Sequence, residues 1–163
     1  MNLGILDEQV TKLIEYSNND PDVNKFTSDS ERFRDHAAYE RWRSQGRTVY
    51  TLVGGKDELY GIIWFGKKSL PGAVFSGKFD PGNYTITFAI RIYGDARGKG
   101  LAKPFMRNVF NHFSPKQGVW LETSGDNIAA VRAYTNFGFR KITNPNRDGK
   151  ILMVLPKGVT IDK

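Results

Sequence analysis

The chain has 163 residues, of which 39% are hydrophobic, 13% aromatic and 25% charged, an ordinary composition for a soluble globular protein. We expect a single domain over residues 1–163. The absence of cysteine excludes disulfides, thiolate metal ligands and an acyl-cysteine intermediate. With two histidines, His36 and His112, no metal site is expected. No apolar run approaches the length of a membrane span and no signal-peptide pattern is present, so we expect a cytoplasmic protein without membrane contact.

The net charge of +7 is unevenly distributed along the chain. Residues 1–80 contain 11 Lys and Arg against 12 Asp and Glu, whereas residues 81–163 contain 13 against 5. The basic carboxyl-terminal half would suit a polyphosphate ligand, and it would equally suit nucleic acid. Charge alone does not choose between them.

The first half of the chain predicts two helices and a β-hairpin. Apolar spacing predicts a helix over residues 5–16, ended by a turn at 18–22. A second helix is expected from the cap Ser28, with Glu31 three residues on, to about residue 45. Strands at 47–53 and 58–65 would pair across a turn at 54–57. A long loop, 69–83, follows, in which Phe75 and Phe79 are candidate lid anchors or packing residues.

Residues 84–113 predict a strand, a basic glycine turn and a helix. Residues 84–93 are rich in β-branched and aromatic side chains, and apolar residues recur at a period of 3.6 after residue 100. Gly98 and Gly100 let the backbone approach a ligand closely, and the first N–H groups of a helix have no partner within it. Those groups attract anions, and Arg97, Lys99 and Lys103 add positive charge. The stretch therefore predicts a pyrophosphate site.

Three anion-binding motifs compete for this turn. The P-loop pattern occurs nowhere in the chain. The dinucleotide fingerprint requires glycine or alanine where the chain has Lys103, although an acidic residue, Glu122, does stand about 20 positions beyond the turn. The third pattern, Arg/Gln-x-x-Gly-x-Gly/Ala, is matched at every fixed position by Arg97-Gly-Lys-Gly-Leu-Ala102.

The last third of the chain carries a second pattern. A short strand is expected at 118–123, a turn at 124–127, a helix at 128–136 that Gly138 ends, and an antiparallel strand pair at 140–143 and 151–155. The helix region reads Asn-x-x-Ala-x-x-x-Tyr-x-x-x-Gly-Phe, at residues Asn127, Ala130, Tyr134, Gly138 and Phe139.

These two patterns, in this order and at this spacing, resemble those of the GNAT superfamily of acyl-CoA N-acyltransferases. The resemblance covers roughly residues 47–155 and is specific from 90 to 139. It implies an α+β fold, in which a mixed, mostly antiparallel sheet is splayed into a V and flanked by helices. It further implies acetyl-CoA as co-substrate, and paired carboxyl-terminal strands, common in this fold, imply a homodimer.

The resemblance also assigns the residues that would contact acetyl-CoA. The backbone at the end of the central strand would pair with the pantetheine arm and thioester, the glycine turn would bind the pyrophosphate, and the following helix would contact the arm from the other side. These residues are Ile90, Arg91, Ile92, Arg97, Gly98, Lys99, Gly100, Leu101, Ala102, Asn127, Ala130, Tyr134 and Phe137.

Acyl transfer to an amine requires a base, donors for the oxyanion and an acid for the departing thiolate. Tyr134 is the candidate acid, since a phenol is protonated at neutral pH; the alternative is a core tyrosine. Glu122 is the candidate base, at a spacing from Tyr134 also found in related ribosomal-protein acetyltransferases; the alternative is a structural carboxylate. The expected function is direct transfer of an acetyl group to a primary amine of a small molecule or protein.

Two other classes of function stay open from the sequence. The same fold could bind acyl-CoA without transferring it, as a sensor or interaction module, and would then not need Glu122 or Tyr134. A nucleic-acid-binding protein would use the basic half, but its aromatics do not interleave with Lys and Arg in a recognisable RNA-binding motif. The acceptor amine has no readable code in the sequence.

Overall fold

The structure is a computed structural model that describes residues 1–72 and 80–158. Its α-helices are α1 (Asp7–Asn19), α2 (Pro21–Phe26), α3 (Asp29–Arg32), α4 (His36–Arg43), α5 (Ala102–Phe113) and α6 (Ile128–Phe137). Its strands are β1 (Asn2–Leu3), β2 (Thr48–Val53), β3 (Leu59–Lys67), β4 (Tyr84–Ile92), β5 (Gly118–Ser124), β6 (Arg140–Lys141) and β7 (Lys150–Leu155). The candidate lid residues Phe75 and Phe79 lie outside the described residues.

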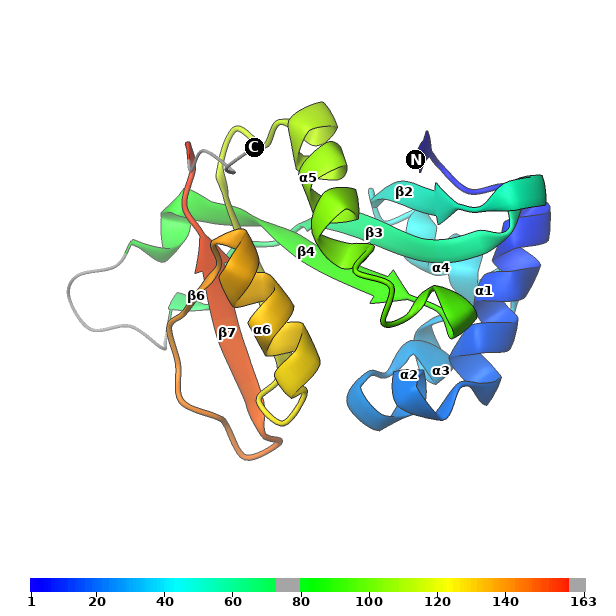
Figure 1. The fold of residues 1–163 in the computed structure, drawn as a ribbon. Coiled ribbons are helices and arrows are strands. Elements are labelled where there is room, and N and C mark those ends of the chain that lie inside the picture. The colour runs from blue at the N-terminus through cyan, green and yellow to red at the C-terminus, as the bar shows by residue number, and fades with distance from the viewer. Residues whose placement is uncertain (73–79, 159–163) are drawn as a thin grey trace.

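The strands form one mixed sheet in the order β1-β2-β3-β4-β5-β7-β6. Only the β4–β5 pair is parallel among the described strands; the others are antiparallel. The parallel pairing ends at Thr87 and Trp120, although β4 stays paired with β3 as far as Ile92. The two strands therefore diverge, and the sheet opens between them as the resemblance implied (Figure 1).

Helices cover both faces of the sheet (Figure 1). On one face, α5 and α6 pack against β3, β4, β5 and β7 through a core rich in phenylalanine, with Phe88 and Phe110 near its centre. On the other face, α1 and the short helices after it pack on β2 and β3, around Phe33, Trp42 and Trp64. A third, smaller apolar cluster around Trp120 and Leu152 lies on β5 and β7, and both of these side chains border the β4–β5 opening.

The amino-terminal region differs from the sequence prediction. The single helix expected over 28–45 is two helices, because Asp35 adopts an extended conformation and its side chain accepts the Ala38 N–H at 2.7 Å. Ser28 makes no side-chain capping bond. The predicted turn at 18–22 also starts a helix that was not expected, α2, with Asp20 as its cap and proline at its first position.

Phe110 offers a test of the phenylalanine core. Its ring is 4% exposed and contacts Phe65, Phe88 and Phe137. We expect Phe110→Ala to lower the free energy of unfolding by about 3–5 kcal/mol, because it leaves a cavity among rings that cannot collapse. Urea unfolding measures this. The exposed Asn108→Ala on the same helix should change stability by less than about 0.5 kcal/mol; an equal loss in both variants would contradict this packing.

Candidate functional site

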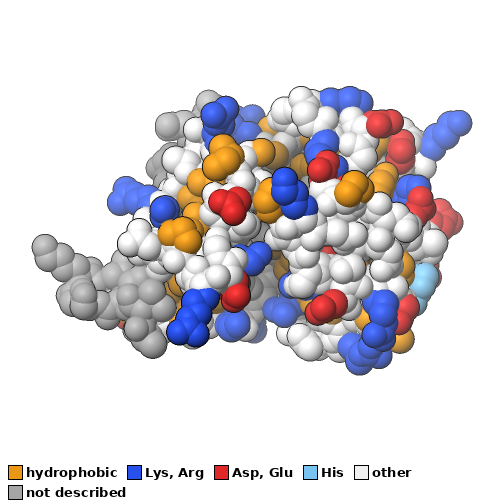
Figure 2. All heavy atoms as spheres, turned by 90° about the horizontal axis from the view of Figure 1, so that it is seen from below, with side chains coloured by type: hydrophobic (Ala, Val, Ile, Leu, Met, Phe, Trp, Pro, Cys, Tyr) orange, Lys and Arg blue, Asp and Glu red, His pale blue; other side chains and the backbone are white. Residues whose placement is uncertain are grey.

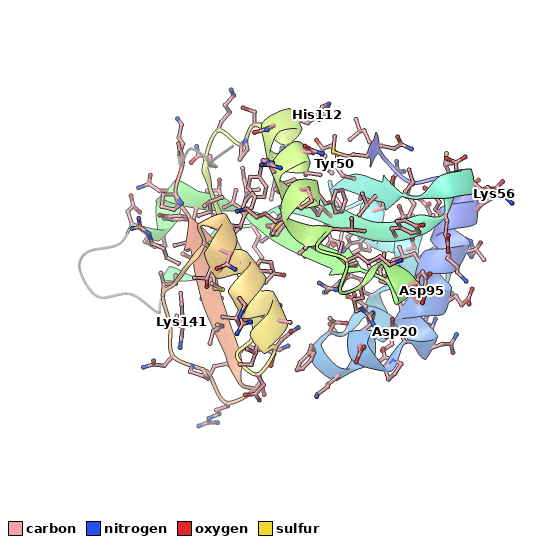
Figure 3. All side chains as sticks on the ribbon, viewed as in Figure 1. Asp20, Tyr50, Lys56, Asp95, His112 and Lys141 are labelled. Atoms are coloured by element: carbon pink, nitrogen blue, oxygen red, sulfur yellow. The ribbon has the colours of Figure 1, made fainter. Side chains whose placement is uncertain are left out.

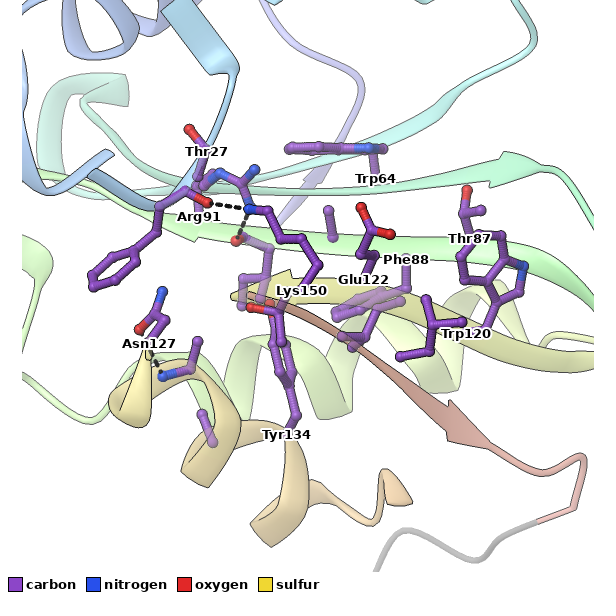
Figure 4. Close-up of a pocket in the computed structure, with 18 of the residues that line it drawn as sticks. Thr27, Trp64, Thr87, Phe88, Arg91, Trp120, Glu122, Asn127, Tyr134 and Lys150 are labelled. Atoms are coloured by element: carbon purple, nitrogen blue, oxygen red, sulfur yellow. Dashed lines mark hydrogen bonds between the residues drawn. The ribbon is translucent and has the colours of Figure 1, made fainter. Parts of the chain in front are cut away.

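A cavity of about 870 Å³ opens where β4 and β5 separate, with α6 on one side and the α2–α3 region on the other. Its described walls include nine of the residues that the sequence singled out, namely Ile90, Arg91, Ile92, Arg97, Ala102, Glu122, Asn127, Ala130 and Tyr134. The central strand and both sequence motifs therefore meet at one site (Figure 4). Phe137 is not part of it: its ring lies in the core against Phe110 and Phe139.

The end of β4 presents unpaired backbone groups to the cavity. Tyr93 donates its N–H to the Tyr60 carbonyl at 2.8 Å. In an antiparallel pair, the backbone N–H and C=O groups of every second residue point to the same neighbouring strand. Since Tyr93 points to β3, the N–H and C=O groups of Ile90 and Ile92 point away from β3 and into the opening. The carbonyls accept hydrogen bonds from Arg91 Nη1 at 2.9 Å and Arg97 Nε at 3.0 Å. The N–H groups are left for a ligand.

The glycine turn has the backbone that an anion site requires. Gly98 and Gly100 have φ of +74° and +71°, which L side chains rarely adopt, and a Cβ at either would meet nothing within 4 Å. Within the described residues, the N–H groups of Gly98, Gly100, Leu101 and Ala102 donate no hydrogen bond. The turn and the start of α5 thus expose a row of free donors beside the cavity.

The Arg97 side chain has a different place from that expected. Its guanidinium donates to Asp22 at 2.9 Å and to Asp20, which caps α2. Figure 3 shows Asp20 beside the turn that carries Asp95. Two carboxylates therefore neutralise Arg97, and Arg97 ties the turn to α2. The exposed Lys99 provides free charge in this turn, together with the exposed Lys103 at the start of α5.

Tyr134 and Glu122 line the cavity from two different elements, a helix and a strand (Figure 4). Tyr134 comes from α6 and is 5% exposed, and burial raises the pKa of its phenol, with a smaller opposing effect from Arg91. Its hydroxyl has no hydrogen-bond partner among the described residues. Glu122 comes from β5, opposite Leu152 of β7, and its carboxylate is solvent-accessible and unpaired within the same residues. A protonated phenol and a free carboxylate thus face one space.

Asn127 caps α6 at the cavity edge. Its side-chain carbonyl accepts the Ala130 N–H at 3.1 Å, which fixes the amide so that its NH₂ group points away from the helix and toward the cavity (Figure 4). The residue can therefore start the helix and also donate to a ligand.

A buried ion cluster under the cavity was not predicted from the sequence. Asp29 is fully buried and accepts hydrogen bonds from Arg91 Nε at 2.6 Å, Arg91 Nη2 at 3.1 Å and Arg32. Burial alone would raise the pKa of Asp29, but the two guanidinium groups outweigh it and the pKa is lowered. The Arg91 guanidinium also lies 5.0 Å from the Trp64 ring. The cluster locks the β4 end to α3 across 62 residues of sequence, a pairing that no local pattern reveals.

The sequence of residues 13–139 matches the family model described as the acetyltransferase (GNAT) family. The chain belongs to the GNAT acetyltransferase family. No curated protein sequence matches it. Within the described residues, this GNAT-family protein has no group of acidic or histidine side chains that could hold a metal ion. No described helix is long and apolar enough to cross a membrane.

Solved structures agree with this assignment. The chain is similar to a Streptococcus mutans UA159 protein at 17% identity and a TM-score of 0.69, covering 96% of this chain and 99% of that one. It is similar to aminoglycoside acetyltransferase AAC(6')-Ib in complex with coenzyme A, at 18% identity and a TM-score of 0.67. The match covers 95% of this chain and 94% of that one. It is also similar to a mutant of Vibrio cholerae spermidine N-acetyltransferase, at 16% identity and a TM-score of 0.63. The match covers 96% of this chain and 95% of that one. At these identities the likeness shows the fold.

Asp29→Asn tests the buried ion cluster. The substitution leaves Arg32 and Arg91 without their carboxylate, so we expect the free energy of unfolding to fall by about 3–5 kcal/mol at pH 7. Because the folded pKa of Asp29 is below 3.8, its stabilisation is present above that pH and is lost as the pH falls through the folded value.

Denaturant unfolding at several pH values measures both effects. The difference between wild type and Asp29→Asn should shrink below pH 3.8. The exposed Glu40→Gln serves as control and should change stability by less than about 0.5 kcal/mol. A difference that stays constant down to pH 2 would contradict the cluster's electrostatic role.

Proposed function

We propose that this GNAT-family protein transfers an acetyl group from acetyl-CoA directly to a primary amine. One observation carries the proposal: the opening between β4 and β5 brings free backbone donors, a protonated phenol and an unpaired carboxylate to one cavity. The family membership and the coenzyme A complex of a structural neighbour support the choice of co-substrate.

Acetyl-CoA fits the free polar groups of this chain. The pyrophosphate would accept hydrogen bonds from the N–H groups between Gly98 and Ala102, with Lys99 adding charge. The pantetheine arm would pair with the open edge of β4, as a strand does, and meet the Asn127 amide on the other side. Gly98 and Gly100 face open space, so nothing in the described chain obstructs a phosphate there.

The chemistry follows from the groups in the cavity. Glu122, directly or through water, takes a proton from the acceptor ammonium, since an amine with a pKa near 10 is mostly protonated at neutral pH. The amine nitrogen bonds to the thioester carbon, and the N–H of Ile90 or Ile92 would stabilise the oxyanion. The carbon–sulfur bond then breaks and Tyr134 gives its proton to the thiolate. The nitrogen loses its second proton, which returns to the Tyr134 phenolate directly or through water, and the neutral amide is formed. Without cysteine in the sequence, no acyl-cysteine intermediate can form.

A non-catalytic acyl-CoA-binding module is the alternative. It would keep the glycine turn and show no turnover with any amine. Rossmann-type binding of a dinucleotide is not supported, because that fold has a doubly wound parallel sheet and the described sheet has one parallel pair. Acetyl-CoA rather than NAD is therefore the ligand to test first.

Tyr134→Phe separates catalysis from binding. Removing the hydroxyl should lower kcat about 100-fold or more, the scale of general acid catalysis, while the affinity for acetyl-CoA changes little. Thiol release measured with an amine panel gives kcat, and Glu122→Gln should show the same pattern. If wild type binds acetyl-CoA but releases no thiol beyond the level of Tyr134→Phe, the non-catalytic module is correct.

Lys99→Glu tests the pyrophosphate site. Reversing this exposed charge beside the free N–H groups should weaken acetyl-CoA binding about tenfold or more in a calorimetric titration. Lys116→Glu beyond the far end of α5 makes the same charge change and should have no effect. Arg97 is unsuitable for this test, since its replacement also breaks the link to α2. Wild-type binding to NAD but not to acetyl-CoA would refute the proposed co-substrate.

A further inference from the structure

The acceptor side of the cavity is positively charged. The described walls of the whole cavity include six basic side chains, Arg32, Arg47, Lys68, Arg91, Arg97 and Lys150, against two acidic ones, Asp22 and Glu122. Figure 2 looks at the molecule from below and shows Lys and Arg side chains around the central hollow. Arg97 is neutralised by its aspartates, and Arg32 and Arg91 share one carboxylate. Arg47, Lys68 and Lys150 make no ion pair within the described residues.

Arg47 reaches this side of the cavity across a glycine. Gly66 of β3 is paired with Thr87 of β4, and a Cβ on Gly66 would lie 2.1 Å from Arg47 Nη1 and 2.8 Å from Thr87 Oγ1. Because glycine has no side chain, the guanidinium occupies the space that a Cβ on Gly66 would fill, on the side of the sheet where the Thr87 hydroxyl lies. The Trp42 ring lies 5.8 Å from it on the helical side.

Few hydrogen-bond donors of the Arg47 guanidinium have a partner among the described residues. Its Nε is buried without a hydrogen-bond partner among the described residues, and Nη2 has one long bond, 3.4 Å, to Gln45 Oε1. Arg47 is thus partly buried and has free donors, so an anion could form charge-assisted hydrogen bonds with its guanidinium. Lys68 follows β3 on the same rim, where its carbonyl accepts the Trp120 indole N–H at 2.8 Å.

We infer that the acceptor amine carries an anionic group, a carboxylate or a phosphate, which Arg47 binds with help from Lys68. This inference rests on the proposed acetyl transfer and names the substrate class of the same site. Thr87 precedes Ile90 by three residues, so the anion would lie about 10 Å along β4 from the oxyanion donors. An acceptor whose anion lies several bonds from its amine spans that distance. A purely cationic polyamine would meet repulsion there.

The three tryptophans of the chain, Trp42, Trp64 and Trp120, all line this cavity, so intrinsic fluorescence reports its occupancy. We would titrate coenzyme A-saturated protein with pairs that differ only in the anion: lysine against cadaverine, and glucosamine 6-phosphate against glucosamine. The anionic member of at least one pair should bind about tenfold or more tightly, the scale of a charge-assisted hydrogen bond. The pair with the larger ratio identifies carboxylate or phosphate as the anion.

Arg47→Gln should abolish most of that ratio, whereas Arg43→Gln, an equal charge change on an exposed residue outside the cavity, should preserve it. Arg47→Lys keeps the charge and should give an intermediate ratio, which guards against a folding defect in Arg47→Gln. Equal affinity within both pairs would overturn the inference, and so would the absence of binding by every member. Tighter binding of spermidine than of every anionic amine would overturn it as well. Binding of acetyl-CoA, titrated separately, shows whether the proposed co-substrate survives that result.

Discussion

The separation of β4 from β5 is the constraint on which the rest of the structure depends. The parallel ladder ends at Thr87 and Trp120, and beyond it β4 has one paired and one open edge. Unpaired backbone groups away from water are costly, so an open edge requires partners. Here Arg91 and Arg97 satisfy the carbonyls of Ile90 and Ile92, while the N–H groups stay available. Side chains of the protein thus satisfy the backbone carbonyls of this edge, and the backbone N–H groups stay free for a ligand.

Two arginines of the central segment join the site to the amino-terminal helices. Arg91 is held by the buried Asp29, the first residue of α3, and Arg97 by the aspartates at the start of α2. Each also donates to a carbonyl of β4. Helices α2 and α3 are therefore fastened to the end of β4 and to the glycine turn on one side of the cavity.

The walls of the cavity combine positive charge with aromatic rings. Lys150 donates to the Phe26 carbonyl at 3.2 Å, which connects the start of β7 to the end of α2 across the mouth. The unpaired carboxylate of Glu122 lines the same cavity as these cations. This charge pattern favours an acceptor that brings an anion of its own. Arg47 and Lys68 belong to the half of the chain whose charges nearly balance, so the pattern arises from their placement and not from the overall net charge.

The sequence by itself determined the family, the mixed sheet and the place of the central strand, turn and helix, because their signals are local: Gly98, Gly100 and the Asn127–Phe139 pattern lie within short stretches. It also predicted Glu122 and Tyr134 as partners in one site, and both line the cavity. It failed where the physical cause is distant in sequence. Asp29 pairs with Arg91 across 62 residues, Arg97 with Asp20 across 77, and the Arg47 guanidinium lies over Gly66. Only the tertiary structure decides such contacts, because the energy of a charge depends on what folding brings beside it.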